Sequence, residues 1–452
     1  MKNTINQLRN FWQKISFSNE KNTAFNPDLD EESLAQIKVD IDYCVHSMAG
    51  EMSLRTHACK IASDYQSLSE VGREKFFMLL LNHYHFDQEN ADTIISNWKN
   101  NEDDVWCLRA ALESQSLKLF KLFNGLNEGV KFLVDMRADM LSAQKNNIAF
   151  KPLQNELKYL LKEWFDLGFL ELKEVNWNSP ALLLEKLIKY EAVHAIRDWS
   201  DLKNRLDSDR YCYAFFHPQM ENEPLIFIEV ALTNGVVGNI AQLLDENAPT
   251  VDPMSADSAM FYSISNTQSG LAGISFGNYL IKSVVKELQK NHPNLTNFAT
   301  LSPIPGFNHW LGQNISTVDE VLSKDEKDAF ISVSQSVTIE STLKALLYSS
   351  WLENESVKAA LDKPLRKLAL HYLSKEKSGN NRAKDPVAHF HLSNGASIGK
   401  IHVLANTSSR GMKESSGMML NYLYMLDKIE NNGIQYVENG IISTDQVKKK
   451  KK

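Results

Sequence analysis

The feature that most constrains the fold of this chain is a change in hydrophobic periodicity near residue 176. Before it, apolar residues recur at spacings of three and four, the pattern of one helical face. One such face comprises Leu153, Leu157, Leu160, Leu161, Trp164 and Phe165. After it, short segments are rich in aromatic and β-branched residues, as is typical of strands. We therefore predict a multidomain α and α/β protein, with an all-helical bundle over residues 1–175 and a mixed-sheet α/β domain over residues 176–452.

Length and charge exclude some classes of function. The chain has 452 residues, which at roughly 150 residues per domain favours two or three domains. The formal net charge of −7 provides no global basic field for nucleic acid, and Lys448–Lys452 are interpreted as a solvated tail. A phosphorylated ligand must therefore be bound locally, by backbone N–H groups or a few cations.

Cysteine usage and hydropathy bear on the compartment. The four cysteines form no CxxC pair, so a reducing compartment is expected. No apolar run approaches the roughly 18 residues of a membrane span, so we expect no membrane partner. Residues 5–15 are compatible with an amphipathic helix and a weak organelle presequence. Because the acidic Glu20 and Asp28 follow soon, we predict a cytoplasmic protein.

The second domain begins with a helix start and continues with strands. A serine before a proline predicts that Ser179 caps a helix with Pro180 in its first turn. Residues 315–375 are predicted to be helical again. The predicted strands are Tyr211–Phe216, Leu225–Leu232, Phe261–Ser265 and Asn297–Leu301, followed by a hairpin of Val387–Leu392 with Lys400–Leu404 across Asn394-Gly395.

A glycine-rich loop lies between a predicted strand and a predicted helix. Gly270, Gly273 and Gly277 let the backbone approach a ligand, and free N–H groups at the helix start favour a pyrophosphate. The spacing differs from G-x-G-x-x-G, so a purely structural turn is an equal alternative. Acetyltransferases of the GNAT superfamily place coenzyme A at this kind of loop, which the segment resembles.

Four further segments strengthen a family resemblance. They are Phe261–Ser265, Leu280–Leu288, Leu301–Phe307 and Asp385–Ala396. In this order, around the glycine-rich loop, they resemble the conserved core of malonyl-CoA decarboxylases over roughly residues 180–445. The helical first domain agrees in size with the oligomerisation domain of that family.

The resemblance implies an activity, partners and a site. It implies a GNAT-like domain that converts malonyl-CoA to acetyl-CoA and CO₂ in fatty acid metabolism, in a homo-oligomer (a dimer or tetramer). It places Ser302 and His391 at the catalytic serine and histidine. The residues that would line the acyl-CoA site are Ala272, Gly273, Ile274, Ser275, Phe276, Gly277 and Asn278. Animal members carry a glutamate near Ser275 that supports the active site, and the serine here leaves the loop without that acidic partner.

The chemistry needs no cofactor, because the thioester is itself the electron sink. Loss of CO₂ leaves an enolate whose charge gathers on the thioester oxygen, where preorganised donors stabilise it. A histidine, with a hydroxyl to share the relay, is suited to protonate the α-carbon. We therefore expect no metal, biotin or pyridoxal phosphate.

Each candidate residue also has a structural interpretation. Ser302 precedes Pro303 and is compatible with a simple turn, and His391 with a core histidine. His389 and His402 offer a metal site with His391, but no glutamate follows at cupin spacing.

Three further residues stay open on sequence alone. Tyr422 and Tyr424 are interpreted as core aromatics, with Tyr424 a candidate for a supporting hydroxyl. Arg410 is a phosphate ligand or a surface cation. Two rival functions remain at this point: an acyl-CoA-dependent acyltransferase, and a catalytically silent CoA-binding assembly protein.

Overall fold

The computed structural model describes residues 25–86, 88–100, 105–274, 277–332, 341 and 351–445. These residues form two compact units. The first contains the chain before Glu171 together with His217–Glu221 and Gln268–Ile274. The second contains Glu171–Phe216, Asn222–Thr267 and the chain from Ser275 onward.

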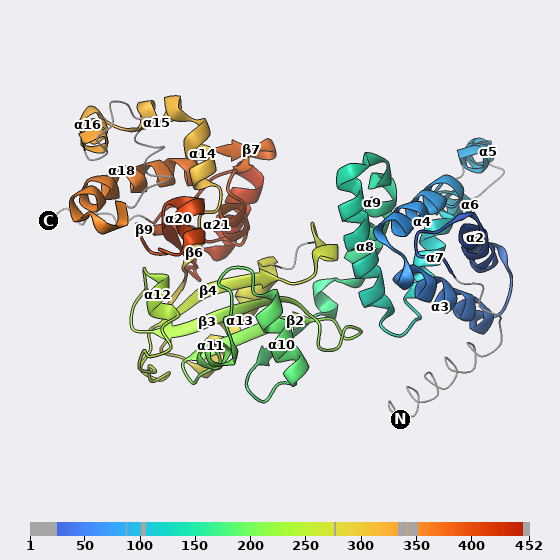
Figure 1. Ribbon diagram of the computed structural model, residues 1–452, viewed down its shortest axis with the longest axis horizontal. Helices are drawn as coiled ribbons and strands as arrows, with labels where there is room; N and C mark the ends of the chain where they lie inside the picture. The colour runs from blue at the N-terminus through green and yellow to red at the C-terminus, as the bar shows by residue number, and fades with distance from the viewer. Residues whose placement is uncertain are drawn as a thin grey trace. The chain divides into compact units, whose positions relative to one another are not determined.

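The first unit is helical, as predicted (Figure 1). Its α-helices are α2 (Glu31–His46), α3 (Glu51–Ser67), α4 (Glu70–His83), α5 (Gln88–Lys99), α6 (Val105–Ala111), α7 (Gln115–Phe123), α8 (Gly129–Asn146) and α9 (Lys151–Trp164). Their core is aromatic: the ring of Tyr65 meets those of Phe76 and Phe132 edge-on at 5.2 and 5.6 Å. The side chain of Ser69 caps α4 by accepting a hydrogen bond from the N–H of Gly72.

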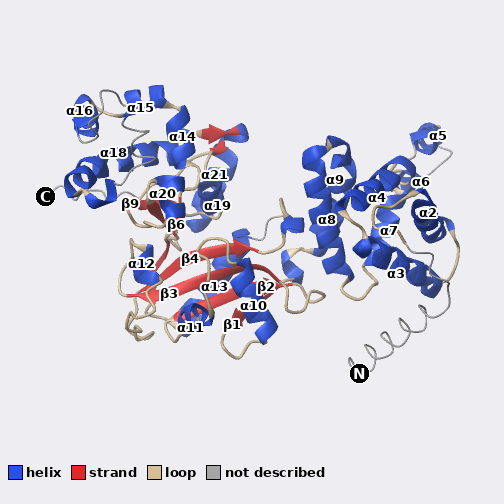
Figure 2. Cartoon of the chain, in the orientation of Figure 1, coloured by secondary structure: helices blue, strands red, loops and turns tan. Residues whose placement is uncertain are grey.

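The second unit is built on one mixed sheet, which confirms the predicted class (Figure 2). Its strands are β1 (Glu171–Val175), β2 (Arg210–Phe216), β3 (Pro224–Thr233), β4 (Ser258–Asn266), β5 (Asn297–Thr300), β6 (Ser302–Pro303), β9 (Ser397–His402) and β10 (Met419–Leu423). The order is β1-β2-β3-β4-β5-β10-β6, with β9 also paired to β10. Only β4 and β5 pair in parallel among these described strands, and α13 (Gly277–Asn291) connects them.

Helices cover both faces of this sheet. On one face, Leu183 and Leu187 of α10 (Ala181–Tyr190) pack with Cys212 of β2, and α11 (Trp199–Arg205) joins the same core. On the other face, the ring of Phe215 in β2 stacks on that of Tyr279 in α13, with centroids 6.1 Å apart. The β2 residues alternate between the two faces with the period of two of a strand.

The remaining described elements complete the second unit. They are α12 (Ile240–Leu243), α14 (Phe307–Gln313), α15 (Ile315–Val321), α16 (Lys324–Ser332), α18 (Glu355–Ser374), β7 (Lys377–Ser378), β8 (Arg382–Ala383), α19 (Pro386–Ser393), α20 (Ser409–Ser415) and α21 (Ile429–Asn439). Within the described ranges, no helix is both long enough and apolar enough to cross a membrane.

Two local predictions near the domain boundary are wrong. Glu171–Val175, expected to be helical, is strand β1 and pairs antiparallel with β2. The helix after the break begins at Ala181 with Pro180 at its cap position, while the hydroxyl of Ser179 accepts a hydrogen bond from the N–H of Asn176. Ser179 therefore stabilises the turn before α10 instead of capping it.

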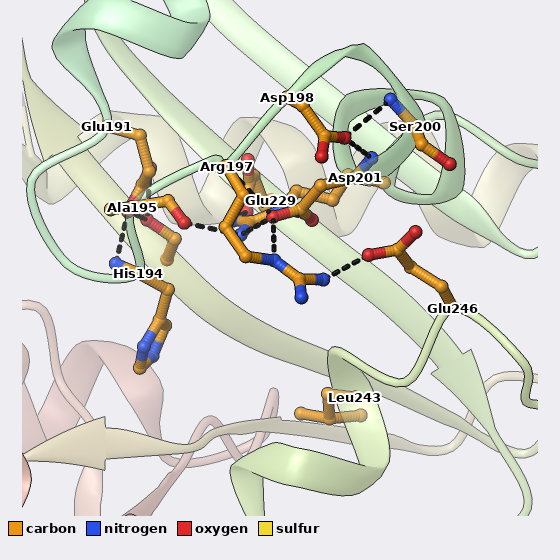
Figure 3. A network of polar contacts seen from close by, with 12 residues as sticks. Glu191, His194, Ala195, Arg197, Asp198, Ser200, Asp201, Glu229, Leu243 and Glu246 are labelled. Carbon is orange, nitrogen blue, oxygen red and sulfur yellow. Dashed lines mark hydrogen bonds and ion pairs between the residues drawn. The ribbon is translucent and has the colours of Figure 1, made fainter. Parts of the chain in front are cut away.

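A buried ionic network lies on the α11 side of the sheet (Figure 3). Arg205 donates from Nε to Asp201 at 2.8 Å and from Nη1 to Glu229 of β3 at 2.9 Å. All three side chains are buried. Burial raises the pKa of Glu229, and the charge of Arg205 opposes this shift. Removing one partner of such a group leaves an uncompensated buried charge.

Candidate active site

Ser302 lies where the sheet turns from β5 to β6. Its strand β6 pairs with β10, where Ser302 is opposite Leu420. The side chain is buried, and Oγ donates a hydrogen bond to Oγ1 of Thr300 at 2.8 Å. Thr300 Oγ1 also accepts the N–H of Tyr422 in β10, so the neighbouring strand fixes this threonine. Ser302 is therefore held by two strands and not by a loop.

His391 lies in the last turn of α19, not on the strand that we predicted over Val387–Leu392. Asp385 caps this helix, since its Oδ1 accepts the N–H of Ala388 at 2.9 Å, and Pro386 occupies the first helical position. The helix ends at Ser393 with Asn394 as its C-cap, and Gly395 follows with φ +85°. The Asn-Gly pair that we interpreted as a hairpin turn is thus a helix C-terminus.

The structure brings Ser302, His391 and Tyr424 into one hydrogen-bonded chain. Nε2 of His391 lies 3.1 Å from Oγ of Ser302, and Nδ1 lies 2.7 Å from the hydroxyl of Tyr424. Because the Ser302 hydroxyl donates to Thr300, its oxygen accepts from His391, which requires a proton on Nε2. Nδ1 is then an acceptor for the hydroxyl of Tyr424. Every polar atom of the chain is satisfied by this tautomer.

Burial keeps this chain uncharged. Burial lowers the pKa of His391 to about 3, and it raises that of Tyr424 well above its usual value of 10.0. His391 is therefore a neutral imidazole at pH 7. Its pKa lies well below the near-neutral value of an ordinary histidine. The ring of Tyr422 stacks on the imidazole with centroids 4.4 Å apart, which fixes its plane.

The predicted acyl-CoA loop is divided in the structure. Ala272, Gly273 and Ile274 belong to the helical unit. Gly277 and Asn278 open α13, and only their backbone is described. Ser275 and Phe276 lie outside the described residues, so the structure does not test the consequence of a serine at position 275.

The other candidates have partners elsewhere. Nδ1 of His389 lies 2.9 Å from the hydroxyl of Tyr436, and Nε2 of His402 lies 2.6 Å from Oδ1 of Asn421. Arg410 donates to the carbonyl of Ala192 at 2.5 Å and forms an ion pair with Glu414 at 2.8 Å. These contacts give the three side chains structural roles in the second unit.

Sequence reasoning missed Thr300, the ring contact of Tyr422 and the cap at Asp385. The Asp385-Pro386 pair was a readable signal, since an N-cap residue before a proline marks a helix start. No local signal points to Thr300, because its role depends on the pairing of β5, β6 and β10.

The fold and the site together define a class of enzyme. A mixed α/β sheet that carries a buried serine–histidine–tyrosine chain is typical of an enzyme that moves protons or stabilises an oxyanion. Comparison with known proteins then gives the family. The profile described as "Malonyl-CoA decarboxylase C-terminal domain" matches residues 168–452, and "Malonyl-CoA decarboxylase N-terminal domain" matches residues 84–165.

Individual relatives agree. "Malonyl-CoA decarboxylase, mitochondrial" of Rattus norvegicus is 40% identical over 353 residues, which are 75% of this chain and 72% of the rat protein. The protein of the same name from Anser anser anser is 39% identical over 71% of this chain and 66% of its own length. The crystal structure of malonyl-CoA decarboxylase from Rhodopseudomonas palustris superposes with a TM-score of 0.83 at 36% identity, over 92% of this chain and 98% of that one.

The chain therefore belongs to the malonyl-CoA decarboxylase family. It is a carboxy-lyase that acts on malonyl-CoA.

Proposed function

We propose that the chain releases CO₂ from malonyl-CoA at Ser302 and His391, forms acetyl-CoA, and uses Tyr424 to fix the imidazole. The observation that carries this proposal is the continuous buried chain from the Tyr424 hydroxyl through both imidazole nitrogens to Ser302. Such a chain fixes the position of the Ser302 hydroxyl on a rigid part of the sheet.

A neutral site suits this reaction. The substrate carboxylate loses its charge as the C–C bond breaks, while charge grows on the thioester oxygen. A cation beside the carboxylate would stabilise the ground state and slow the reaction, whereas neutral donors near the thioester oxygen favour the transition state. The low pKa of His391, about 3 because of burial, supports such an uncharged site.

The proton balance follows from the same chain. The electron pair of the broken C–C bond forms the thioester enolate, CO₂ departs, and the α-carbon takes one proton. Ser302 supplies this proton and receives another from Nε2 of His391, 3.1 Å away, while Nδ1 takes the proton of the Tyr424 hydroxyl. One proton from solvent restores the site in each turnover, which matches the net reaction of malonyl-CoA and H⁺ to acetyl-CoA and CO₂. No step of this scheme calls for a metal or an organic cofactor.

Two further assignments extend this proposal. Ala272–Asn278 bind the acyl-CoA through backbone N–H groups, with Gly273 at φ +75° as the position that needs a glycine. Residues 1–175 assemble a dimer or tetramer and contribute no catalytic group. The purified protein should then sediment as a dimer or larger at micromolar concentration in analytical ultracentrifugation, and a monomer would rule out assembly.

We predict that the protein acts in the cytoplasm and serves fatty acid metabolism. The goose, rat and mouse relatives, in contrast, are named mitochondrial. Imaging of the whole chain with a C-terminal fluorescent tag tests this. Organelle targeting through the first residues would contradict the cytoplasmic location without affecting the chemistry.

The test of the activity is direct. Purified protein is mixed with malonyl-CoA, and acetyl-CoA and CO₂ are measured together, with an amine acceptor added in a parallel reaction. Equal amounts of acetyl-CoA and CO₂, unchanged by the amine, are expected. Acyl transfer to the amine would instead support the acyltransferase alternative, and no turnover would support a silent CoA-binding protein.

A further inference from the structure

We propose that the helical unit takes part in acyl-CoA binding through two cations, Arg137 and Lys158. Arg137 acts as a positioning residue that holds the loop Gln268–Ile274. Lys158 supplies a positive charge beside Gly273 for a phosphate group of coenzyme A. This inference rests on the proposed role of Ala272–Asn278 in acyl-CoA binding, and it extends the role of the helices beyond assembly.

Arg137 is a buried cation whose donors face the loop. It lies in α8 and is 1% exposed. Its Nη1 donates to the carbonyl of Gly270, and its Nη2 donates to the carbonyl of Ala272 at 2.8 Å. With its amide oriented to satisfy both of its polar atoms, Gln154 accepts from Nε and Nη2, both at 2.9 Å. Three elements are thus joined by one guanidinium.

Arg137 is a buried charge that has no carboxylate partner among the described residues, although a buried unpaired charge is costly. Burial lowers the pKa of Arg137 to about 10, so the side chain remains protonated at pH 7. A neutral glutamine or methionine would fill such a core position at lower cost. The fork of the guanidinium instead orients two loop carbonyls at once.

Backbone packing holds the same loop against α8. A Cβ built on Gly270 would lie 1.8 Å from the carbonyl oxygen of Val134, so only glycine permits this approach. Gly270 and Leu271 are buried within the 3₁₀ turn Ser269–Leu271. The loop conformation is therefore set by the helical unit before any ligand arrives, which reduces the entropy lost on binding.

Lys158 brings a cation to the exposed side of this loop. It lies in α9 and is half-buried. A Cβ built on Gly273 would lie only 3.0 Å from its Nζ. In the described part of the chain, the Lys158 ammonium has no carboxylate partner, and the N–H of Gly273 donates to no backbone or side-chain acceptor. A free N–H beside an unpaired ammonium suits a phosphate oxygen.

Because the chain is acidic overall, phosphate binding depends on local cations such as Lys158. With a net charge of −7, the protein does not attract a polyanion such as coenzyme A as a whole. Phosphate binding must then come from particular side chains placed at the binding segment. Lys158 meets this requirement through its position beside Gly273, one of the proposed binding residues.

The first test compares Lys158→Ala with Lys118→Ala. Lys118 is exposed on α7, so its removal changes net charge equally without touching the loop. Affinity for acetyl-CoA is measured by calorimetry at low and moderate salt. We expect Lys158→Ala to weaken binding by roughly three- to thirtyfold, the range of a charge-assisted contact at a half-buried site, with kcat nearly unchanged. Equal affinities for the two variants would overturn the role of Lys158.

The same measurement with 3′-dephospho-acetyl-CoA identifies the phosphate. If Lys158 contacts the 3′-phosphate, the effect of Lys158→Ala disappears with this ligand. If it contacts the pyrophosphate, the effect remains in full. Either result supports the proposal, and each assigns the ammonium to one group of the ligand.

The second test addresses the loop itself. Arg137→Lys retains the charge but loses the fork, and Gly270→Ala displaces the loop from Val134 without changing any charge. Gly168→Ala, where a Cβ would approach only the Asp166 carboxylate at 3.4 Å, is the matched glycine control. Hydrogen exchange of the peptide over residues 268–274 should accelerate in the first two variants, and KM should rise more than kcat falls. Unchanged exchange and KM in folded protein would overturn the role of Arg137.

Failure of this inference is distinguishable from failure of the proposed chemistry. Ser302→Ala should abolish most turnover while acetyl-CoA binds normally. If it does so and the Arg137 and Lys158 variants bind acetyl-CoA like the wild type, the helical unit has no part in binding and the chemistry stands. If Lys158→Ala weakens binding but Ser302→Ala remains active, the binding role stands and the catalytic assignment fails.

Discussion

Replacing Tyr424 by phenylalanine tests the tautomer on which the mechanism depends. The variant removes one hydroxyl from a fully enclosed side chain and leaves Nδ1 of His391, now 2.7 Å from that hydroxyl, as a buried acceptor without a donor. An unsatisfied buried group costs about 1–3 kcal/mol. If this energy is lost in the transition state, turnover falls by about five- to 160-fold, since each 1.36 kcal/mol is a factor of ten.

Tyr422→Phe is the matched control for this change. Tyr422 is equally buried and stacks on the same imidazole, but its hydroxyl has no hydrogen-bond partner among the described residues. Phenylalanine keeps the stacked ring, so stability and kcat should stay close to those of the wild type. Both variants are compared by urea unfolding and by initial rates of acetyl-CoA formation. If Tyr424→Phe behaves like Tyr422→Phe in both assays, the Tyr424 hydroxyl does not fix the imidazole.

Three further predictions concern stability and cofactors. Burial lowers the pKa of His391 from 6.5 to about 3, so between these pH values the unfolded chain binds more protons than the folded one. The free energy of unfolding should therefore decrease as the pH is lowered through this range. This group should cost about 2 kcal/mol between pH 8 and pH 5, and an unchanged acid profile in His391→Gln would contradict it. Arg205→Met should lower the free energy of unfolding by about 3–5 kcal/mol by leaving Glu229 unpaired, and a neutral effect in urea titrations would argue against the buried network. Activity should survive exhaustive chelation, and its loss with recovery on adding one divalent metal would refute a metal-free reaction.

The sheet was predictable where local composition and topology agree. The hairpin of β2 and β3 and the order β4–loop–α13–β5 follow from aromatic and β-branched runs separated by turn residues. The helix α19 was not, because Val387–Leu392 has the composition of a strand. Its cap by Asp385 and its packing decide the structure: a Cβ on Gly395 would lie 1.8 Å from the carbonyl oxygen of Ile429. Tertiary context overrides β propensity in this segment.

The site was predictable only through family resemblance. Ser302 and His391 are 89 residues apart in sequence, and His391 and Tyr424 are 33 apart. No spacing rule connects residues at such separations, since strand pairing and helix capping bring them together. The contacts of Arg137 with Gly270 and Ala272 join residues that are even farther apart in sequence, and no sequence pattern predicted them.

The most direct test of the central claim is a double-mutant cycle on Ser302 and His391. Initial rates are measured at one pH for Ser302→Ala, His391→Ala and the double variant, with the affinity of a non-reactive malonyl-CoA analogue as the control. Each single variant should lose roughly 10²–10⁴ in turnover, as expected for positioned acid–base groups, while analogue binding changes far less. The double variant should be scarcely slower than the slower single one, because the two residues act as one relay. Near-wild-type turnover in either single variant, or losses that multiply in the double variant, would contradict the assignment of the active site.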